Sequence, residues 1–307
     1  GGASTNNWSN AANWANGAIP LRGNVAQINI PTGANITYDS GLVGQLASSS
    51  TIVNNGVITF NSPSDFALAN NISGTGSINQ LGLGLLTVSG NNSFSGGINI
   101  NGSQLALANS NALGTGAITS AGGYLSLSSG VTLPQLTVNG AINLMSDIRT
   151  VGAQTYNGAV SVLANNVING VVAPMQFITN NANILFASTL DAGVDSLAAR
   201  RSILIDVGTG QVTFGDRVGA NNTTFSAFLN RTADLSPYEL TVNAAKILAK
   251  ADITTFEKQT YNGDVIISDN GSNGLTRLFL SEDPTIVFYG RIDDAVANTH
   301  TLIVKAI

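Results

Sequence analysis

The chain has 307 residues, of which only 9% are charged, and it carries no cysteine. Its 12 basic and 17 acidic residues give a net charge of −5, which argues against a nucleic-acid partner, since phosphate binding needs clustered Lys and Arg. Without cysteine the chain has no disulfide framework and no thiolate metal site, and no apolar run is long enough to span a membrane.

Residues 1–40 are predicted to form an N-terminal entry or capping coil. They contain both tryptophans of the chain, Trp8 and Trp14, followed by an alternating strand at Gln27–Ile30. Stacked repeats need a capping element where the apolar column would otherwise end. We therefore interpret the two tryptophans as an end cap, with stacking on a sugar ring as the alternative.

Residues 41–135 consist of short alternating apolar and polar runs separated by Gly and Asn. Each run has the length of a β-strand. Gly and Asn accept the positive φ that tight corners require, and stacked Asn side chains can hydrogen-bond in ladders. Strands are predicted at Thr51–Phe60, Leu85–Val88, Ile98–Ile100, Gln104–Leu107 and Tyr124–Leu127.

Residues 136–307 contain an internal repeat. The sequence QTYNGAV at Gln154–Val160 returns as QTYNGDV at Gln259–Val265, and Leu136–Asn139 matches Leu240–Asn243. These matches predict two modules, about 136–239 and 240–307, made of coils of about 20–25 residues, in which Tyr156 and Tyr261 are packing or turn residues. Strands are predicted at Leu136–Val138 and Gln211–Phe214, and a faintly helical pattern occurs at Leu240–Lys250 and Asp191–Arg201.

Together these patterns predict an all-β chain folded as a right-handed parallel β-helix, or β-solenoid, with loop insertions in the C-terminal half. Stacking coil on coil buries a continuous apolar column that no single coil could bury alone. Before position 140 the only charged residues are Arg22, Asp39 and Asp65. Low charge suits such a stack, because like charges on neighbouring strands repel.

A family resemblance rests on three segments. Residues 72–100, ISGTGSINQLGLGLLTVSGNNSFSGGINI, closely resemble the autotransporter-associated β-strand repeat. Trp8–Thr37 is similar to the entry coil of large bacterial surface proteins, and the two C-terminal modules resemble haemagglutinin-type repeats. The matching positions of the first segment are Gly74, Gly76, Ile78, Gly82, Gly84, Leu86, Thr87, Val88, Ser89, Gly90, Asn92, Phe94, Gly96, Gly97 and Ile100.

The resemblance implies a non-catalytic passenger that is exported across the bacterial outer membrane and acts at the cell surface, or after secretion, as an adhesin or structural protein. It implies no cofactor, and a partner that is a protein or glycan on a host or neighbouring cell. The alternatives are a self-assembling surface-layer or fibre subunit, which associates through its solenoid ends, and a polysaccharide-degrading β-helix enzyme. The chain stops inside an apparent strand at Leu302–Ile307, so we expect a longer parent protein or a partner that covers this edge.

The sequence predicts no catalytic, cofactor-binding or metal-binding residues, although several groups were weighed for such roles. His300 is the only histidine, and we interpret it as a solvated turn residue rather than the centre of a catalytic triad. Asp293-Asp294 and Glu282-Asp283 could bind calcium, but solvated acidic turns are favoured.

Two further patterns have ordinary structural interpretations. Arg200-Arg201 with Asp191, Asp195 and Asp206 is the best candidate for polysaccharide chemistry, against a surface ion-pair patch, which is favoured. The pairs Gly74-x-Gly76 and Gly82-x-Gly84 superficially resemble phosphate-binding loops, but no helix follows them. We interpret these glycines as coil corners.

Overall fold

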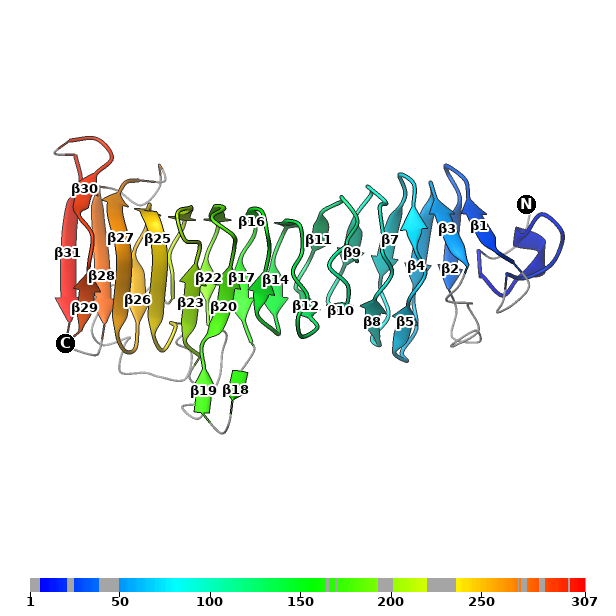
Figure 1. Cartoon of the computed structure of the whole chain (residues 1–307), viewed down its shortest axis with the longest axis horizontal. Coiled ribbons are helices and arrows are strands. Elements are labelled where there is room, and N and C mark those ends of the chain that lie inside the picture. The colour runs from blue at the N-terminus through cyan, green and yellow to red at the C-terminus, as the bar shows by residue number, and fades with distance from the viewer. Residues whose placement is uncertain are drawn as a thin grey trace. The chain divides into compact units, whose positions relative to one another are not determined.

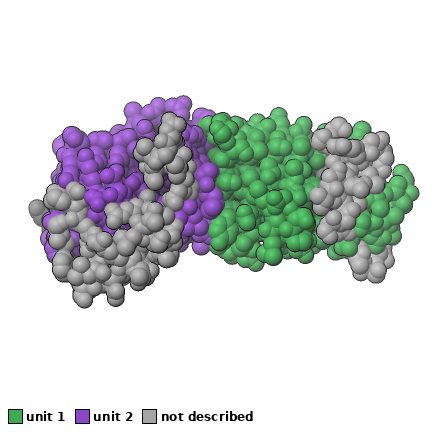
Figure 2. All heavy atoms as spheres, turned by 90° about the horizontal axis from the view of Figure 1, so that it is seen from below, with its two compact units in different colours: residues 1–139 green, residues 140–307 purple. Residues whose placement is uncertain are grey.

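The computed structural model describes residues 6–20, 25–38, 50–163, 166–168, 171–192, 201–219, 236–269, 271, 275–281, 285–297 and 299–306. The chain divides into two compact units, residues 1–139 and 140–307 (Figure 2). Each unit is built from parallel strands stacked in columns, which confirms the prediction of an all-β parallel β-helix. The single helix among the described residues is a short 3₁₀ turn, η1 (Ala11–Asn13).

Unit 1 has three columns of parallel strands, so each coil presents up to three faces (Figure 1). The first column contains β2 (Asn35–Tyr38), β4 (Val57–Phe60), β7 (Ser77–Gln80), β9 (Ile98–Ile100), β11 (Ile118–Ser120) and β13 (Leu136–Asn139). The second contains β5 (Phe66–Leu68), β8 (Leu85–Val88), β10 (Gln104–Leu107) and β12 (Gly123–Leu127). The third contains β1 (Gln27–Ile30), β3 (Thr51–Asn54) and β6 (Ile72–Ser73).

The first column of unit 1 repeats every 20 residues from β4 to β13. Ile78 pairs with Ile98, and Ile98 pairs with Ile118, so each of these coils takes 20 residues. Because alternate strand residues point to opposite faces, the in-register isoleucines stack along the inside and are at most 1% exposed. The alternation in the sequence therefore becomes the apolar column of the unit. The predicted strands Leu85–Val88, Ile98–Ile100, Gln104–Leu107 and Tyr124–Leu127 are confirmed, whereas the predicted run Thr51–Phe60 forms two strands, β3 and β4, in different columns.

A ladder of glycines explains how closely the coils approach. Gly56, Gly76, Gly96 and Gly116 lie on successive coils at the corner before the first column. A Cβ on Gly76 would lie 2.2 Å from the carbonyl oxygen of Gly56, and a Cβ on Gly96 would lie 2.4 Å from that of Gly76. No side chain larger than hydrogen fits between the backbones there, so these glycines are required by contact between coils.

Unit 2 has the same parallel architecture but less regular coils. One column contains β15 (Ile148–Arg149), β20 (Met175–Ile178), β23 (Ile203–Asp206), the first part of β25 (Leu240–Ala249), the first part of β27 (Gln259–Ile267) and β29 (Ile286–Phe288). A second contains β16 (Gln154–Tyr156), β21 (Ile184–Phe186), β24 (Gln211–Phe214), the later parts of β25 and β27, and β30 (Ile292–Asp294). The remaining parallel strands are β14 (Ile142–Leu144), β17 (Val160–Val162), β22 (Leu190–Asp191), β26 (Ile253–Thr255), β28 (Thr276–Ser281) and β31 (Thr301–Ala306).

Two expectations for this region are wrong. Leu240–Lys250 is not helical, because β25 forms there and pairs on both sides with parallel strands. Coil length is also not confined to 20–25 residues: Val160 pairs with Leu190, and Ile203 pairs with Leu240. One insertion is the antiparallel hairpin of β18 (Asn166–Ile168) and β19 (Val171–Ala173). The other faintly helical segment, Asp191–Arg201, lies mostly outside the described residues.

The internal repeat of unit 2 is visible in its contacts. Tyr156 stacks on Phe186 with ring centroids 5.1 Å apart, and Tyr261 stacks on Phe288 at the same distance. However, the sequence match does not preserve the column: β16 belongs to the column of β24, whereas the matching start of β27 pairs with residues 240–243 of β25. The second copy of the repeat therefore lies in the column of the first half of β25 and not in that of its second half, within the same sheet.

Candidate functional site

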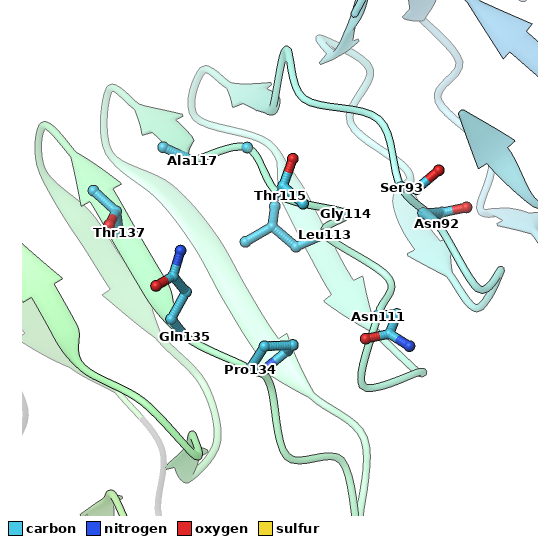
Figure 3. Close-up of a pocket in the computed structure, with 11 residues that line it drawn as sticks. Asn92, Ser93, Asn111, Leu113, Gly114, Thr115, Ala117, Pro134, Gln135 and Thr137 are labelled. Carbon is cyan, nitrogen blue, oxygen red and sulfur yellow. The ribbon is translucent and has the colours of Figure 1, made fainter. Parts of the chain in front are cut away.

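A surface hollow of about 330 Å³ lies on unit 1, where three successive coil segments meet (Figure 3). The chain bends there at Gly114, whose φ of +65° is a conformation that favours glycine. A Cβ on Gly114 would lie 2.3 Å from the carbonyl oxygen of Phe94, so this turn packs directly on the backbone of the preceding coil. Its lining is Asn92, Ser93, Asn111, Leu113, Gly114, Thr115, Gly116, Ala117, Pro134, Gln135 and Thr137.

The groups around the hollow are polar but uncharged. Gln135, Thr115 and Ser93 are exposed, and Thr137 is half-buried, so an amide and three hydroxyls can each donate and accept hydrogen bonds. Asn111 is partly engaged, because its Nδ2 donates to Oδ1 of Asn91 at 2.9 Å. This mixture of neutral donors and acceptors suits a ligand rich in hydroxyl groups rather than an ion.

Asparagine ladders accompany the hollow, as the composition predicted. Nδ2 of Asn99 donates to Oδ1 of Asn79 at 2.7 Å, one coil away. Asn91 and Asn111 form the matching link beside the hollow, and Asn91 also donates its backbone N–H to Oδ1 of Asn71. Because stacked coils repeat the same side chain at strand spacing, the outer surface of unit 1 presents periodic neutral amides.

The tryptophans lie at the first coil of unit 1 and pack as the cap interpretation requires. Trp8 is 1% exposed and contacts Tyr38 with ring centroids 5.6 Å apart. Its Nε1 donates to the carbonyl oxygen of Pro20 at 3.1 Å, and Trp14 is half-buried against it at 4.8 Å. A buried Trp8 with its N–H already bonded cannot offer its ring face to a sugar.

His300 is not a solvated turn residue, which corrects the expectation from sequence. Its side chain is 2% exposed. Nδ1 lies 2.5 Å from Oδ1 of Asp294, and Nε2 lies 3.3 Å from Oδ2 of Asp269. The local sequence around position 300 shows no partner for Nε2, because Asp269 reaches it only through coil stacking.

Asp294 also differs from the solvated acidic turn that was expected, because its carboxylate is hydrogen-bonded. Its carboxylate accepts the backbone N–H groups of Val296, Thr299 and His300 at 2.9–3.1 Å, so its oxygens organise the turn between β30 and β31. The described residues include no group of three or more His, Cys, Asp or Glu side chains that could hold a metal ion. Glu282 and Asp283 lie outside the described residues.

The candidate polysaccharide cluster is assembled differently from the expectation. Asp191 is 6% exposed and pairs with Arg217, at 3.1 Å from Oδ1 to Nη1. Desolvation raises the pKa of Asp191 despite this partner. Arg201 donates to the carbonyl oxygen of Ala192. Arg200 and Asp195 lie outside the described residues.

Asp206 and the paired glycines are explained locally. Oδ1 of Asp206 accepts the backbone N–H of Gly208 at 3.3 Å. A Cβ on Gly82 or Gly84 would lie within 2.2 Å of a carbonyl oxygen on the preceding coil. These glycines are corners between strands, as interpreted from the sequence, and no helix begins beside them in the described chain.

Tyr156 and Tyr261 are buried packing residues, as predicted. Both are 0% exposed. Each hydroxyl donates to the glutamine two residues earlier, Gln154 at 3.0 Å and Gln259 at 2.8 Å. Burial raises the pKa of both phenols well above the ordinary value, so neither is suited to act as a base.

No family model, curated protein or solved structure matches the chain. Among the described residues, no helix has the length and apolarity needed to cross a membrane. The class of the protein therefore follows from its own architecture: it is a parallel β-helix with 20-residue coils along the first column of unit 1 from β4 to β13 and coils of varied length in unit 2.

Proposed function

We propose that the chain is a non-catalytic β-solenoid passenger of a bacterial cell-surface or secreted protein, exported across the outer membrane, that acts as an adhesin or structural module. The observation that carries the proposal is the outer surface of unit 1. There, uncharged amides and hydroxyls repeat from coil to coil, and Asp65 is the one charged residue among those described. The resemblance of residues 72–100 to autotransporter-type repeats supports the proposed location at the cell surface or outside the cell.

We place ligand binding in the hollow around Gln135 and Thr137 and expect a neutral glycan there. Sugar hydroxyls match side chains that both donate and accept hydrogen bonds, and the exposed ring of Pro134 can contact the apolar face of a sugar. A periodic surface of this kind reaches high affinity when the ligand contacts several coils at once, and it does not need one deep pocket.

A binding assay on a panel of immobilised neutral oligosaccharides tests the proposal with the purified chain. Gln135→Ala should weaken binding about 5- to 10-fold, the equivalent of one hydrogen bond. Gln104→Ala is the matched control, because Gln104 is exposed on β10 outside the hollow, and it should leave binding unchanged. Equal losses in both variants, or hydrolysis of the oligosaccharides at enzymatic rates, would contradict the proposal.

A self-assembling subunit is the second candidate, and the apolar side chains exposed on β31 and beside β29 and β30 favour it. Tyr289 is 72% exposed, Val296 60%, Ile303 45% and Val304 46%. Exposed apolar patches mark association sites. Light scattering after size-exclusion chromatography should give a mass that rises with concentration, and Val304→Lys should abolish the rise. A mass that stays at one chain at every concentration would exclude this candidate.

A further inference from the structure

The turn that precedes the last strand of unit 2 is tied to the rest of the coil through one buried imidazole. His300 lies between β30 and β31, and its side chain is 2% exposed. Asp294 approaches Nδ1 from the end of β30, at 2.5 Å. Asp269 approaches Nε2 from the segment after β27, at 3.3 Å.

The two carboxylates determine the protonation state of the ring. A neutral imidazole carries one N–H and one bare nitrogen, whereas the imidazolium carries two N–H donors. Both ring nitrogens face carboxylate oxygens, which only accept hydrogen bonds, so only the imidazolium satisfies both contacts. The hydroxyl of Thr299, 2.8 Å from Nδ1, donates to the carbonyl oxygen of Val296 and does not replace either carboxylate.

We propose that Asp269, His300 and Asp294 form a pH-sensitive clasp that holds the β30–β31 turn against the end of β27 while His300 is protonated, and that loosens when His300 loses its proton. Asp294 keeps its backbone hydrogen bonds in either state, so the turn itself persists. The link to Asp269 is what deprotonation weakens, because that contact joins two separate segments through Nε2.

The surrounding charges agree with this assignment. The hydrogen bond to Asp294 raises the pKa of His300 against the opposing effect of desolvation. The hydrogen bond from His300 lowers the pKa of Asp269, to which Arg277 on β28 adds a smaller contribution. Desolvation opposes ionisation of Asp294, but hydrogen bonds from the backbone and ring of His300 outweigh it and lower its pKa.

The sign of the pH dependence follows from linkage. A histidine whose folded pKa is raised stabilises the fold fully below its unfolded pKa of about 6.5, and that contribution is lost as the pH rises through the folded pKa. The two aspartates contribute above about pH 4 and lose their contribution as the pH falls through their lowered pKa values. The clasp therefore contributes fully between about pH 4 and 6.5, and it opens as the pH rises through the raised folded pKa of His300.

The chain offers an unusually direct test, because His300 is its only histidine. NMR titration of the imidazole resonances of the full chain measures this pKa without assignment ambiguity. We expect a pKa above 6.5, the ordinary value, and a decrease of about 0.5 or more in Asp269→Asn. The matched control is Asp264→Asn, which removes a carboxylate from β27 that pairs with Arg291 instead, and it should leave the pKa of His300 unchanged.

Amide hydrogen exchange provides the second readout, corrected for the intrinsic effect of pH. Peptides covering residues 295–306 should lose protection several-fold between pH 6 and pH 8.5 in the unmodified chain, whereas residues 72–100 should not change. His300→Gln should show the weaker protection at both pH values. A His300 pKa at or below its ordinary value, a pKa unaffected by Asp269→Asn, or pH-independent protection of residues 295–306 would overturn the proposal.

Discussion

At the scale of single residues, the molecule depends on polar side chains that find partners inside or between coils. The two Gln–Tyr pairs are the clearest case. Gln259 is 0% exposed, and its Nε2 donates to the carbonyl oxygen of Leu280 at 2.7 Å while its Oε1 accepts from Tyr261. Gln154 and Tyr156 repeat the arrangement. Each pair lets a coil bury a polar amide and an aromatic ring together.

Removing one hydroxyl should measure this contribution. Tyr261→Phe keeps the ring stacked on Phe288 but deprives Oε1 of Gln259 of its donor, so we expect a loss of about 1–3 kcal/mol in the free energy of unfolding. Denaturant titration, followed through a signal from unit 2, measures this loss in the free energy of unfolding. Tyr289→Phe, at a ring that is 72% exposed, should change stability by less than about 0.5 kcal/mol. Equal effects would show that the buried hydroxyl contributes nothing specific.

At the scale of elements, the coil corners limit how tightly strands can stack. Parallel strands in a column lie about 4.8 Å apart, and the corner backbones of unit 1 approach closely enough that a Cβ would meet a carbonyl oxygen. Some glycines serve a different purpose. Gly102 has a φ of +66° and open space around it, so it is required by the turn and not by contact between coils.

The two kinds of glycine should respond differently to substitution. Gly96→Ala places a methyl group 2.4 Å from the carbonyl oxygen of Gly76, so the coils must separate, at a cost of about 1–3 kcal/mol. Hydrogen exchange in β7 and β9 should accelerate. Gly102→Asn is the control, because Asn tolerates a positive φ, and those strands should then exchange as in the unmodified chain. Unchanged exchange in Gly96→Ala would contradict the claim that contact between coils requires glycine at this position.

At the scale of the whole molecule, the two units differ in how many charged side chains their described residues contain. Asp65 is the one charged side chain among the described residues of unit 1. Unit 2 contains the ion pairs Arg149–Asp147, Arg217–Asp191 and Arg291–Asp264. Unit 1 is therefore stabilised by apolar stacking and neutral hydrogen bonds, whereas part of the stability of unit 2 depends on electrostatic contacts.

Added salt should accelerate amide exchange beside the ion pairs of unit 2 but not in unit 1. Raising NaCl from about 0.01 to 1 M shortens the screening length from about 30 to 3 Å. Because exposed ion pairs are weak and are screened by salt, amide exchange beside Asp264 and Arg291 should accelerate by at most about five-fold. Exchange in residues 72–100 should stay the same. A uniform response across both units, followed peptide by peptide, would contradict this division.

The sequence by itself determined the strands, the corners and the class of fold. Alternation and strand length are local properties, so Gln27–Ile30 and Leu85–Val88 could be assigned without knowing their neighbours. The 20-residue spacing of the glycines in unit 1 likewise records coil contacts directly in the chain. The exception is Leu240–Lys250, where a helix-like composition was overridden by pairing with strands on both sides.

Only the tertiary structure decided which side chains meet. Asp269 and His300 are joined because successive coils bring the end of β27 beside the turn before β31, and Asp191 meets Arg217 for the same reason. The hollow around Gln135 also depends on three stacked segments. Coil lengths in unit 2 vary with their insertions, so the register that sets these contacts is a property of stacking and cannot be derived from local pattern.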